Sequence, residues 1–376
     1  MHSDIPSPCF VIEENKLLSN LLLMEKVRKE AGVDILVALK GMSFWHYFPL
    51  IKQYLSGACA SSVNEARLIN EEMGVKAHTY APAYSESDFE QLLSLSQTIT
   101  FNSLNQWGKY KNKMFLHPEI HAGLRINPGY SEIETDIYNP AVPGSRLGIP
   151  VDKMPTELPN GISGLHFHVL CEQDSYVLER VLKVVEEKFG HLLKQAQWLN
   201  MGGGHHITRA DYDTEHLIAL LKNFKLKYPN LKIILEPGEA VGWRTGFLLA
   251  TVLDIVENGG IKTAILDVSF SAHMPDTLEM PYKPIITGAG EPDQFQFNYR
   301  MGGSTCLAGD FYGDYSFPEE LKLGDRIEFE DMIHYTMVKT TLFNGVRHPH
   351  IGKIDKNGRF SLLRSIGYQE YKNRLS

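Results

Sequence analysis

The chain has 376 residues, of which 43% are hydrophobic, 22% charged and 10% aromatic. That apolar share can fill a large core, and the length suits one large domain or two of moderate size. The 37 Lys and Arg against 45 Asp and Glu give a net charge of −8, which argues against a nucleic-acid partner because such proteins carry a basic excess. Four widely spaced cysteines without a CxxC pair argue against a disulfide scaffold and against a thiolate zinc site.

The first residues do not follow the pattern of a targeting segment. Asp4, Pro6 and Pro8 stand where a signal peptide would have a basic start and an apolar run. The longest apolar stretch, residues 247–256, contains Asp254 and is much shorter than the ~20 residues of a membrane span. We therefore expect a cytoplasmic protein with reduced cysteines and no membrane partner.

Over the first two-thirds of the chain, short apolar runs alternate with helix-like stretches. The runs are residues 34–40, 57–61, 76–82, 98–103, 121–128, 161–170, 196–204 and 232–238. The helical patterns between them include residues 62–73, 174–193 and 213–227. Such alternation is typical of parallel βαβ units, and about eight of them predict a closed (β/α)8 barrel, an α/β fold. A doubly wound open sheet is the alternative, because the number of strands counted from one sequence is good only to about one or two.

Beyond Glu239 the pattern changes to β-like runs separated by Gly and Pro. The runs are residues 247–257, 262–270, 293–301, 326–332 and 335–343. We predict a barrel domain over residues 1–240 and a mostly antiparallel C-terminal β-domain over residues 241–376, which the first ~12 residues can join. Residues 127–160 are too long for an ordinary βα connection, and we expect a functional or flexible loop there.

Two charged residues end predicted barrel strands, at the face where barrels place their active sites. Lys40 ends the first strand, where burial would lower its pKa and supply the neutral amine that forms a Schiff base. Glu236 ends the eighth strand, a position that suits a carboxylate holding a protonated ring nitrogen. A solvated lysine at the rim and an ordinary ion pair of the glutamate are the plainer alternatives.

Histidines and glycines follow two further strands. His166 and His168 are two residues apart on the sixth strand and so share a face. They suit a metal site, but only Glu236 adds a well-placed ligand, so we predict no metal and keep that site as the weaker hypothesis. Gly202, Gly203 and Gly204 follow the seventh strand, where backbone N–H groups can bind phosphate, although a plain turn is the alternative. Lysine, histidine, glycines and glutamate together describe a pyridoxal phosphate site.

On these residues the chain resembles the fold-type III pyridoxal-phosphate decarboxylases, which include ornithine, diaminopimelate and carboxynorspermidine decarboxylases. The resemblance covers nearly the whole chain. VALKG implies that Lys40 holds pyridoxal 5′-phosphate, and GLHFHV implies that His168 stacks on its ring. NMGGGH implies phosphate binding by Gly202–Gly204, and EPGE implies that Glu236 pairs with the pyridine nitrogen.

Two later motifs carry further implications of the resemblance. GGSTCLAGD resembles the motif that gives a cysteine, here Cys306, and a nearby acid, Asp310, to the active site of a partner subunit. This implies a homodimer with shared active sites. EDMIHYT followed by LFNG implies that Tyr335 touches the phosphate. Cys306 is the expected catalytic acid and Lys40 the other candidate, whereas a buried structural thiol is the plainer alternative for Cys306.

Departures from the ornithine and diaminopimelate enzymes indicate one branch of the family. Glu239 stands where those enzymes carry Arg, and the stretch SFSAHMPDTLEMPYKP, with Asp276, resembles the carboxynorspermidine/carboxyspermidine branch. The resemblance thus implies decarboxylation of carboxynorspermidine or carboxyspermidine to norspermidine or spermidine. The cationic tail of such a substrate needs carboxylates, for which we expect Glu239 and Asp276, with Asp310 behind them. A surface acid is an equal alternative for Asp276.

Other functions stay open at this point. The nearest alternatives are diaminopimelate decarboxylase, or another basic amino-acid decarboxylase of the same fold, and an amino-acid racemase. A non-catalytic decarboxylase-like binding protein and a metal-dependent barrel hydrolase are more distant. Carboxynorspermidine and carboxyspermidine differ by one methylene, which the sequence does not resolve.

Overall fold

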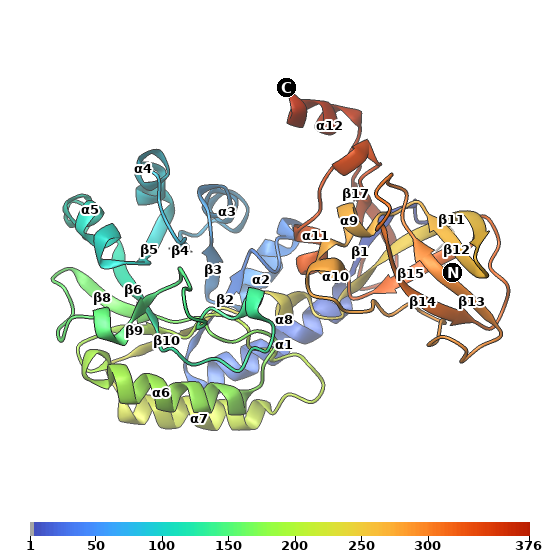
Figure 1. The fold of residues 1–376 in the computed structure, drawn as a ribbon. Helices are drawn as coiled ribbons and strands as arrows, with labels where there is room; N and C mark the ends of the chain where they lie inside the picture. The colour runs from blue at the N-terminus through green and yellow to red at the C-terminus, as the bar shows by residue number, and fades with distance from the viewer. Residues whose placement is uncertain (1–3) are drawn as a thin grey trace. The chain divides into compact units, whose positions relative to one another are not determined.

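The computed structural model describes residues 4–376 and divides the chain into two compact units (Figure 1). Asn20–Val241 form the first unit, here called the barrel domain. The second, the sheet domain, combines the chain up to Ser19 with Gly242–Ser376. In the described part of the chain, no helix combines the length and the apolar character that crossing a bilayer requires.

Eight parallel strands close into a barrel in the first unit. Each pairs with the next in chain order, and the last pairs with the first, so the predicted (β/α)8 barrel is confirmed and the open sheet is wrong. The strands are β2 (Asp34–Ala38), β3 (Gly57–Ala60), β4 (Ala77–Tyr80), β5 (Ser96–Phe101), β6 (His121–Asn127), β8 (Ile162–His166), β9 (Trp198–Asn200) and β10 (Lys232–Leu235). Each lies within one of the apolar runs or overlaps most of it.

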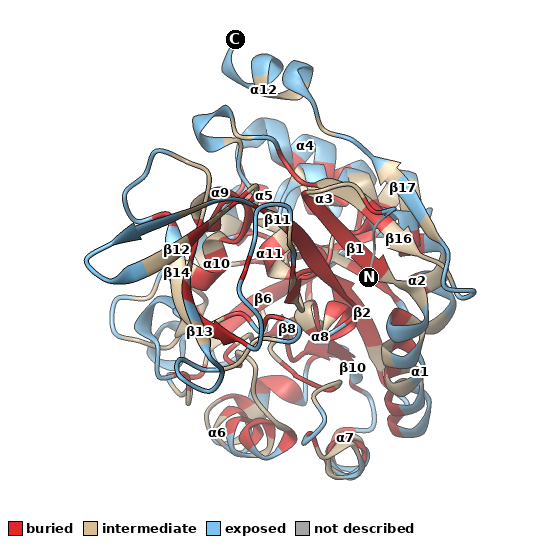
Figure 2. Ribbon diagram, turned by 90° about the vertical axis from the view of Figure 1, so that its right-hand side faces the viewer, coloured by how far each residue is buried: buried red, intermediate tan, exposed pale blue. Residues whose placement is uncertain are grey.

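Helices alternate with these strands and show their buried faces toward them (Figure 2). They are α1 (Glu14–Ala31), α2 (Phe48–Tyr54), α3 (Val63–Leu68), α4 (Glu86–Leu95), α5 (Leu104–Phe115), α6 (Ser175–Leu193), α7 (Thr214–Lys227) and the short α8 (Glu239–Gly242). Serine or aspartate side chains accept hydrogen bonds from the first-turn N–H groups of five of them, at Ser62, Ser85, Ser103, Asp174 and Asp213. These caps satisfy donors that a helix start leaves unpaired and fix where each helix begins.

The long connection after β6 is held in place by asparagine side chains. Asn127 donates its amide hydrogens to the Pro140 and Leu147 carbonyls, and Asn102 donates to the Arg146 carbonyl. A two-residue strand, β7 (Ile149–Pro150), then pairs in parallel with β6. The segment predicted to be a functional or flexible loop thus runs as an ordered connection between β6 and β8.

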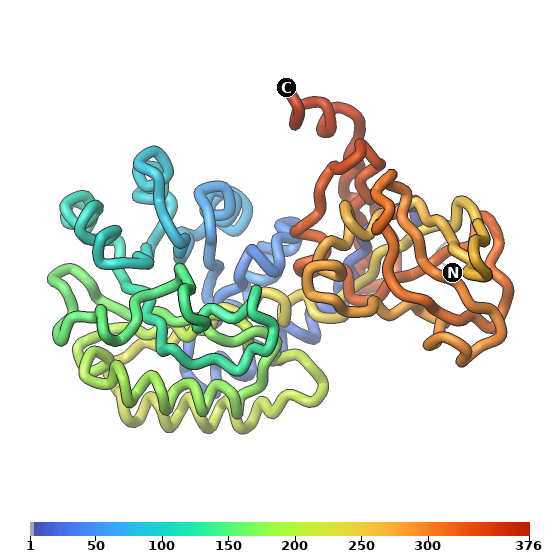
Figure 3. The backbone as a smooth tube through the Cα atoms, viewed as in Figure 1, coloured from blue at the N-terminus to red at the C-terminus, as the bar shows by residue number. Residues whose placement is uncertain are grey.

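The second unit is built on an eight-stranded, mostly antiparallel sheet, as predicted. Its strands are β1 (Cys9–Glu13), β11 (Gly246–Asn258), β12 (Ile261–Leu266), β13 (Phe297–Gly302), β14 (Phe311–Phe317), β15 (Arg326–Glu330), β16 (His350–Ile354) and β17 (Phe360–Arg364). The parallel pairs are β1–β16 and β12–β13. In the tube of Figure 3, blue β1 runs through this orange and red part of the chain, where it pairs with both β11 and β16.

Two segments of this unit that were predicted to be β-like are helical. The run 335–343 begins with α11 (Tyr335–Val338), and the end of the run 262–270 enters α9 (Phe270–His273). In α11 the N–H groups of Met337 and Val338 donate to the His334 carbonyl. Local turns therefore satisfy backbone donors that a strand would have offered to a neighbour. Two more helices, α10 (Pro275–Glu279) and α12 (Tyr368–Leu375), complete the unit.

Candidate active site

Lys40 lies at the carboxyl end of β2, beside the turn that follows β10. The Ala38 N–H donates to the Pro237 carbonyl at 3.0 Å, which ties the two strand ends together. Gly41 and Gly238 allow this approach, since a Cβ on Gly238 would lie 2.8 Å from the Ala38 carbonyl oxygen. The tight turn brings Lys40 and the carboxylate that follows β10 to the same end of the barrel.

The Lys40 amine is strongly perturbed by its surroundings. Burial lowers the pKa of its ammonium group, and the nearby Arg125 guanidinium acts in the same direction. The negative charge of Glu236 opposes that shift without cancelling it. These surroundings favour the neutral amine, which is the form that attacks a carbonyl carbon.

His168 is held on the glycine loop by a hydrogen bond to the backbone. Its Nδ1 accepts from the Gly203 N–H at 2.8 Å, and Arg125 Nη2 donates to the His168 carbonyl at 3.0 Å. Burial lowers the pKa of His168 well below its ordinary value. The imidazole is thus neutral, with its proton on Nε2.

The glycine loop after β9 fits tightly against the ends of two neighbouring strands. A Cβ on Gly203 would lie 2.5 Å from the Glu236 carbonyl oxygen, and one on Gly202 would lie 2.5 Å from the Phe167 carbonyl oxygen. Gly202 and Gly204 also have positive φ angles of 70° and 82°, which side chains other than glycine rarely adopt. The loop therefore requires glycine for steric reasons.

Glu236 directly follows β10, and three side chains lie next to its carboxyl group. Asn200 Nδ2 donates to its Oε1 at 2.7 Å, and the thiol of Cys59 hydrogen-bonds to the same carboxyl group. His166 Nε2 lies 3.7 Å from Oε2. Burial raises the pKa of Glu236, whereas the Asn200 hydrogen bond and the charge of Lys40 lower it. These neighbours favour a carboxylate that can pair with a ring N–H.

In the sheet domain, Asp276 has one satisfied and one open oxygen. Tyr282 donates to its Oδ2 at 2.8 Å, and Thr336 donates to the same oxygen at 2.7 Å. Its Oδ1 is buried and has no hydrogen-bond partner among the described residues. A buried carboxylate oxygen without a donor is costly, so a cationic ligand would be favoured there.

Asp310 differs, because both of its oxygens are already occupied. Oδ1 accepts from Ser269 Oγ and the Ser271 N–H, each at 3.0 Å, and Oδ2 accepts from the Thr305 N–H and hydroxyl. The carboxylate is buried and closes the loop that presents the exposed Cys306. The Cys306 N–H in turn donates to Asn344 Oδ1 at 2.8 Å, so this loop is held at both ends.

Comparison with known proteins agrees with this geometry. Residues 10–333 match the family described as "Pyridoxal-dependent decarboxylase, C-terminal sheet domain". The chain is 50% identical to a carboxyaminopropylagmatine decarboxylase of Synechocystis, over 99% of this chain and 96% of that protein. It is 43% identical to a carboxynorspermidine/carboxyspermidine decarboxylase of Campylobacter jejuni, over 99% of both chains.

The chain belongs to the pyridoxal-dependent decarboxylases. The crystal structure of a carboxynorspermidine decarboxylase from C. jejuni, complexed with norspermidine, superposes with a TM-score of 0.91 at 43% identity, over 98% of this chain and all of the other. A diaminopimelate decarboxylase from Helicobacter pylori shares the fold, with a TM-score of 0.81 at 18% identity. The family resemblance read from the sequence is thereby confirmed, and so is the interpretation of the chain as a decarboxylase.

The residues of this decarboxylase fit the family's cofactor. A buried lysine with a lowered pKa, a buried carboxylate and a neutral histidine surround a glycine loop in one domain. Both nitrogens of the buried His166 also have no hydrogen-bond partner among residues 4–376. A further polar group in the site would complete a set that the chain leaves open.

Not every predicted residue lies in the barrel domain. Lys40, His168, Gly202–Gly204, Glu236 and Glu239 belong to it, and Glu239 begins α8. Cys306, Asp310, Asp276 and Tyr335 belong to the sheet domain, where Tyr335 begins α11. The structure thus groups these residues in two sets, one in each domain.

Several residues that lie around these two sets were not predicted from the sequence to belong to the site. In the barrel domain they are Cys59, Arg125 and Asn200, and in the sheet domain Tyr282, Thr336 and Asn344. Arg125 could have been found as a charge inside an apolar run, and Asn200 as a polar residue at a strand end. The sheet-domain residues have no such signal, because they act on residues that are distant in the sequence.

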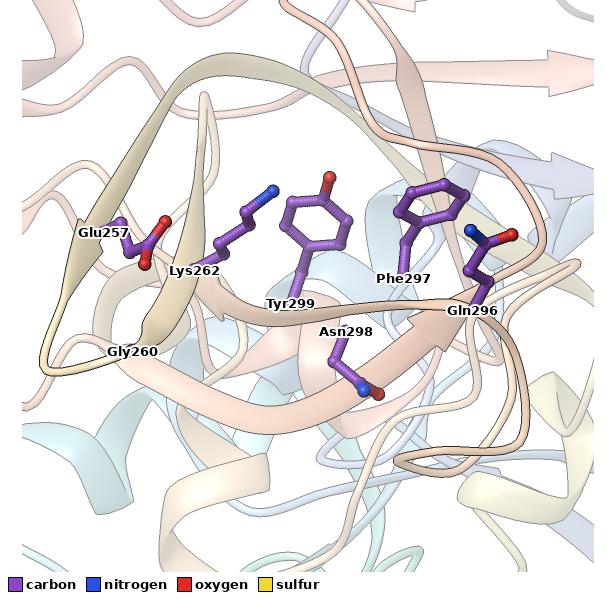
Figure 4. A pocket seen from close by; sticks show the side chains of 7 residues that line it. All are labelled: Glu257, Gly260, Lys262, Gln296, Phe297, Asn298 and Tyr299. Atoms are coloured by element: carbon purple, nitrogen blue, oxygen red, sulfur yellow. The ribbon is translucent and has the colours of Figure 1, made fainter.

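Two other features of the described residues offer less chemistry. No group of three or more His, Cys, Asp or Glu side chains in residues 4–376 is arranged to hold a metal ion. A pocket at β11–β13 is lined by Glu257, Gly260, Lys262, Gln296, Phe297, Asn298 and Tyr299 (Figure 4). Its polar side chains have partners within the domain, such as Glu320 for Lys262 and Asp293 for Asn298. The pocket is therefore a surface feature of the sheet.

Proposed function

We propose that this chain decarboxylates a carboxylated polyamine, with carboxynorspermidine or carboxyspermidine as substrate, to give norspermidine or spermidine. The observation that carries the proposal is the full-length similarity to the C. jejuni enzyme, whose crystal structure holds norspermidine. The similarity to diaminopimelate decarboxylases, at 18% identity, extends to the fold alone. The polyamine assignment is therefore favoured over the amino-acid decarboxylases.

The cofactor of the proposed reaction is pyridoxal 5′-phosphate. When bound, it delocalises the negative charge that loss of CO2 leaves on the substrate carbon. Lys40 would hold it through its side-chain amine, His168 would lie against its ring, and Glu236 would keep its ring nitrogen protonated. Gly202, Gly203 and Gly204 would form the loop around its phosphate, together with Tyr335.

The substrate contacts of the proposal are carboxylates. Asp276 offers a buried oxygen without a donor, which a protonated amine can satisfy. Glu239 provides negative charge next to the turn after β10. Asp310 has its four hydrogen bonds inside the domain, so its part is to hold the Cys306 loop. Cys306, exposed on that loop, is the proposed donor of a proton to the substrate carbon.

We also propose a homodimer with shared active sites. Cys306 lies on an exposed loop, and the apolar side chains near it are exposed as well. Leu307 is 47% exposed, Phe311 40% and Phe343 45%. Exposed apolar side chains around an exposed thiol suit an interface with a second copy of the chain.

A second candidate substrate is carboxyaminopropylagmatine. It is favoured by the 50% identity to the Synechocystis enzyme. Its tail ends in a guanidinium group rather than an ammonium, and a carboxylate such as Asp276 can accept hydrogen bonds from either. The two candidates undergo the same reaction and differ in the cationic group at the end of the substrate's tail.

The test combines spectroscopy with product analysis. Purified protein should absorb in the visible range, and borohydride should fix the cofactor on the peptide that contains Lys40. Lys40→Ala should lose both properties. Carboxynorspermidine, carboxyspermidine, carboxyaminopropylagmatine and diaminopimelate are then compared by kcat/KM, with detection of the amine product.

We expect a preference of at least about tenfold for the first two substrates, a difference of about 1.4 kcal/mol in transition-state binding. A higher kcat/KM for carboxyaminopropylagmatine would establish the second candidate instead. Turnover of diaminopimelate alone would overturn both, and a colourless protein that does not take up the cofactor would overturn the reaction itself.

A further inference from the structure

The side chain of Asn200 makes two hydrogen bonds that point in opposite directions. Its Nδ2 donates to Glu236 Oε1 at 2.7 Å, and its Oδ1 accepts from the Gly202 N–H at 2.9 Å. The first partner is the proposed contact of the ring nitrogen, and the second begins the proposed phosphate loop. A single amide therefore lies between the two ends of the cofactor site.

The backbone around Asn200 is fixed on both sides. It ends β9, where its carbonyl accepts from the Phe167 N–H at 2.9 Å, and it pairs with Ile234 of β10. The Gly202 carbonyl accepts from the Glu236 N–H at 2.7 Å. The side chain of Asn200, which is only 4% exposed, thus spans two residues that also contact each other directly.

The chemistry of this position requires an amide. The Gly202 N–H needs an acceptor, and the Glu236 carboxylate needs a donor. Aspartate would satisfy the first need but not the second, and would place a second negative charge beside Glu236. Alanine would satisfy neither. The amide also lowers the pKa of Glu236, which burial raises, and so favours the ionised form that a ring N–H requires.

We infer that Asn200 is a positioning residue that couples the phosphate loop to the ring-nitrogen carboxylate, and so orients both ends of the bound cofactor. This inference rests on the proposed function, because it assigns Glu236 and the glycine loop to the two ends of pyridoxal 5′-phosphate. It adds Asn200, which hydrogen-bonds to Glu236 at the ring end of the cofactor site and to Gly202 at the phosphate end. The two hydrogen bonds of Asn200 make separate contributions, which two variants can tell apart.

The experiment measures equilibrium binding of pyridoxal 5′-phosphate and of pyridoxal to the apo-protein. Pyridoxal lacks the phosphate. The dissociation constant of pyridoxal divided by that of pyridoxal 5′-phosphate therefore reports the phosphate end, and the dissociation constant of pyridoxal alone reports the ring end. Asn200→Asp keeps the acceptor for Gly202, and Asn200→Ala removes both bonds. Asn127→Asp is the matched control, because Asn127 also ends a barrel strand and has both ends of its amide bonded, to the Gly129 N–H and to the Pro140 carbonyl.

For Asn200→Asp we expect both ligands to bind about tenfold more weakly, since a hydrogen bond to a charged group is lost, with an unchanged ratio. For Asn200→Ala we expect the ratio to fall as well, because the phosphate loop is no longer held. Asn127→Asp should leave the ratio unchanged. A role in general stability would instead weaken both ligands equally in both Asn200 variants, and that result would overturn the inference.

A double variant tests the link to Glu236 without relying on Asn200→Ala. In Glu236→Gln, the new amide can donate to an aspartate at position 200, which restores the hydrogen bond with reversed polarity. Asn200→Asp should therefore weaken pyridoxal binding by less than about threefold in the Glu236→Gln background, against about tenfold alone. An equal effect in both backgrounds would overturn the coupling.

The outcome for the unaltered protein separates this inference from the proposed function. If the wild type binds pyridoxal 5′-phosphate tightly and the Asn200 variants bind it with the same affinity, the inference is wrong and the proposed function is unaffected. A wild-type apo-protein that binds neither ligand removes both. The binding readout does not depend on the identity of the amine substrate.

Discussion

The open oxygen of Asp276 is the strongest indication of a cationic ligand in the sheet domain. Tyr282 and Thr336 fix the orientation of the carboxylate through Oδ2 and leave Oδ1 without a donor. Asp267, a carboxylate of the same domain, has donors on both oxygens, from Ser7 and from the Thr251 N–H. The two residues make a matched pair for removing charge.

Asp276→Asn should raise the KM for a carboxylated polyamine by tenfold or more and change kcat much less. The reason is that a charge-assisted hydrogen bond contributes about 1.5–3 kcal/mol. Glu239→Gln should have the same direction of effect. Steady-state kinetics measure both, with cofactor affinity measured alongside and expected to stay unchanged. Asp267→Asn is the control, and equal KM values for the Asp267 and Asp276 variants would contradict the assignment.

At this scale, the sequence located residues whose role follows from a strand end. Lys40, His168 and Glu236 lie just beyond the ends of β2, β8 and β10, where a barrel collects functional side chains. Cys59 was missed because its contact is another side chain, Glu236, and no spacing rule predicts such a contact. The full set of partners of Asp310 was hidden for the same reason.

Among the elements, the barrel strands were the most predictable. Their positions follow from short apolar runs, and capping residues such as Ser62 and Asp174 mark the helices between them. The sheet domain was less predictable, because β17 carries exposed and polar residues. The run 335–343 has a β-like composition but forms α11, whose Thr336 is turned inward to bond with Asp276. Tertiary contacts there outweigh local preference.

The short helix α9 depends on a histidine that must stay neutral. His273 Nδ1 accepts from the Ser269 N–H at 3.0 Å, and burial lowers the pKa of His273 to about 3. Between that value and the ordinary pKa of about 6.5, the unfolded chain binds a proton that the folded chain does not. The contribution of His273 to the free energy of unfolding is therefore fully present above pH 6.5 and is lost as the pH falls toward 3.

For each buried histidine whose pKa is lowered in this way, the free energy of unfolding should fall by about 1.4 kcal/mol for every pH unit below pH 6. His273→Asn keeps an acceptor for the Ser269 N–H but does not titrate, so its stability should depend less steeply on pH. Urea unfolding between pH 4.5 and 7.5 measures the slope. The control is His191→Asn, at an exposed position of α6. A slope for His273→Asn equal to that of the wild type would contradict this account.

For the whole molecule, the two sets of predicted residues lie in different domains, one with Lys40 and the other with Cys306. The proposed homodimer would bring residues of two copies of the chain into each active site. Because the two sets consist of different residues in different domains, a substitution in one set leaves the other set intact. That separation permits a complementation experiment.

Lys40→Ala and Cys306→Ala should each be close to inactive alone, and subunit exchange between them should restore about a quarter of wild-type activity. Half of the dimers would then be mixed, and each mixed dimer would have one intact site. Activity is followed during exchange, with size-exclusion chromatography to confirm the dimer. Sites formed within a single chain would give no recovery above the mean of the two variants.

The position of β1 has a consequence for biosynthesis. This strand lies between β11 and β16, so residues made at the start of translation pair with residues made after position 245 and after position 349. The barrel, Asn20–Val241, is in effect an insertion within the sheet domain. Domains fold as units during synthesis. The barrel can therefore fold on the ribosome before β11 and β16, the strands that pair with β1, have been synthesised. The Cys306 loop is made late in synthesis, and a nascent chain that ends before position 306 therefore lacks the proposed proton donor.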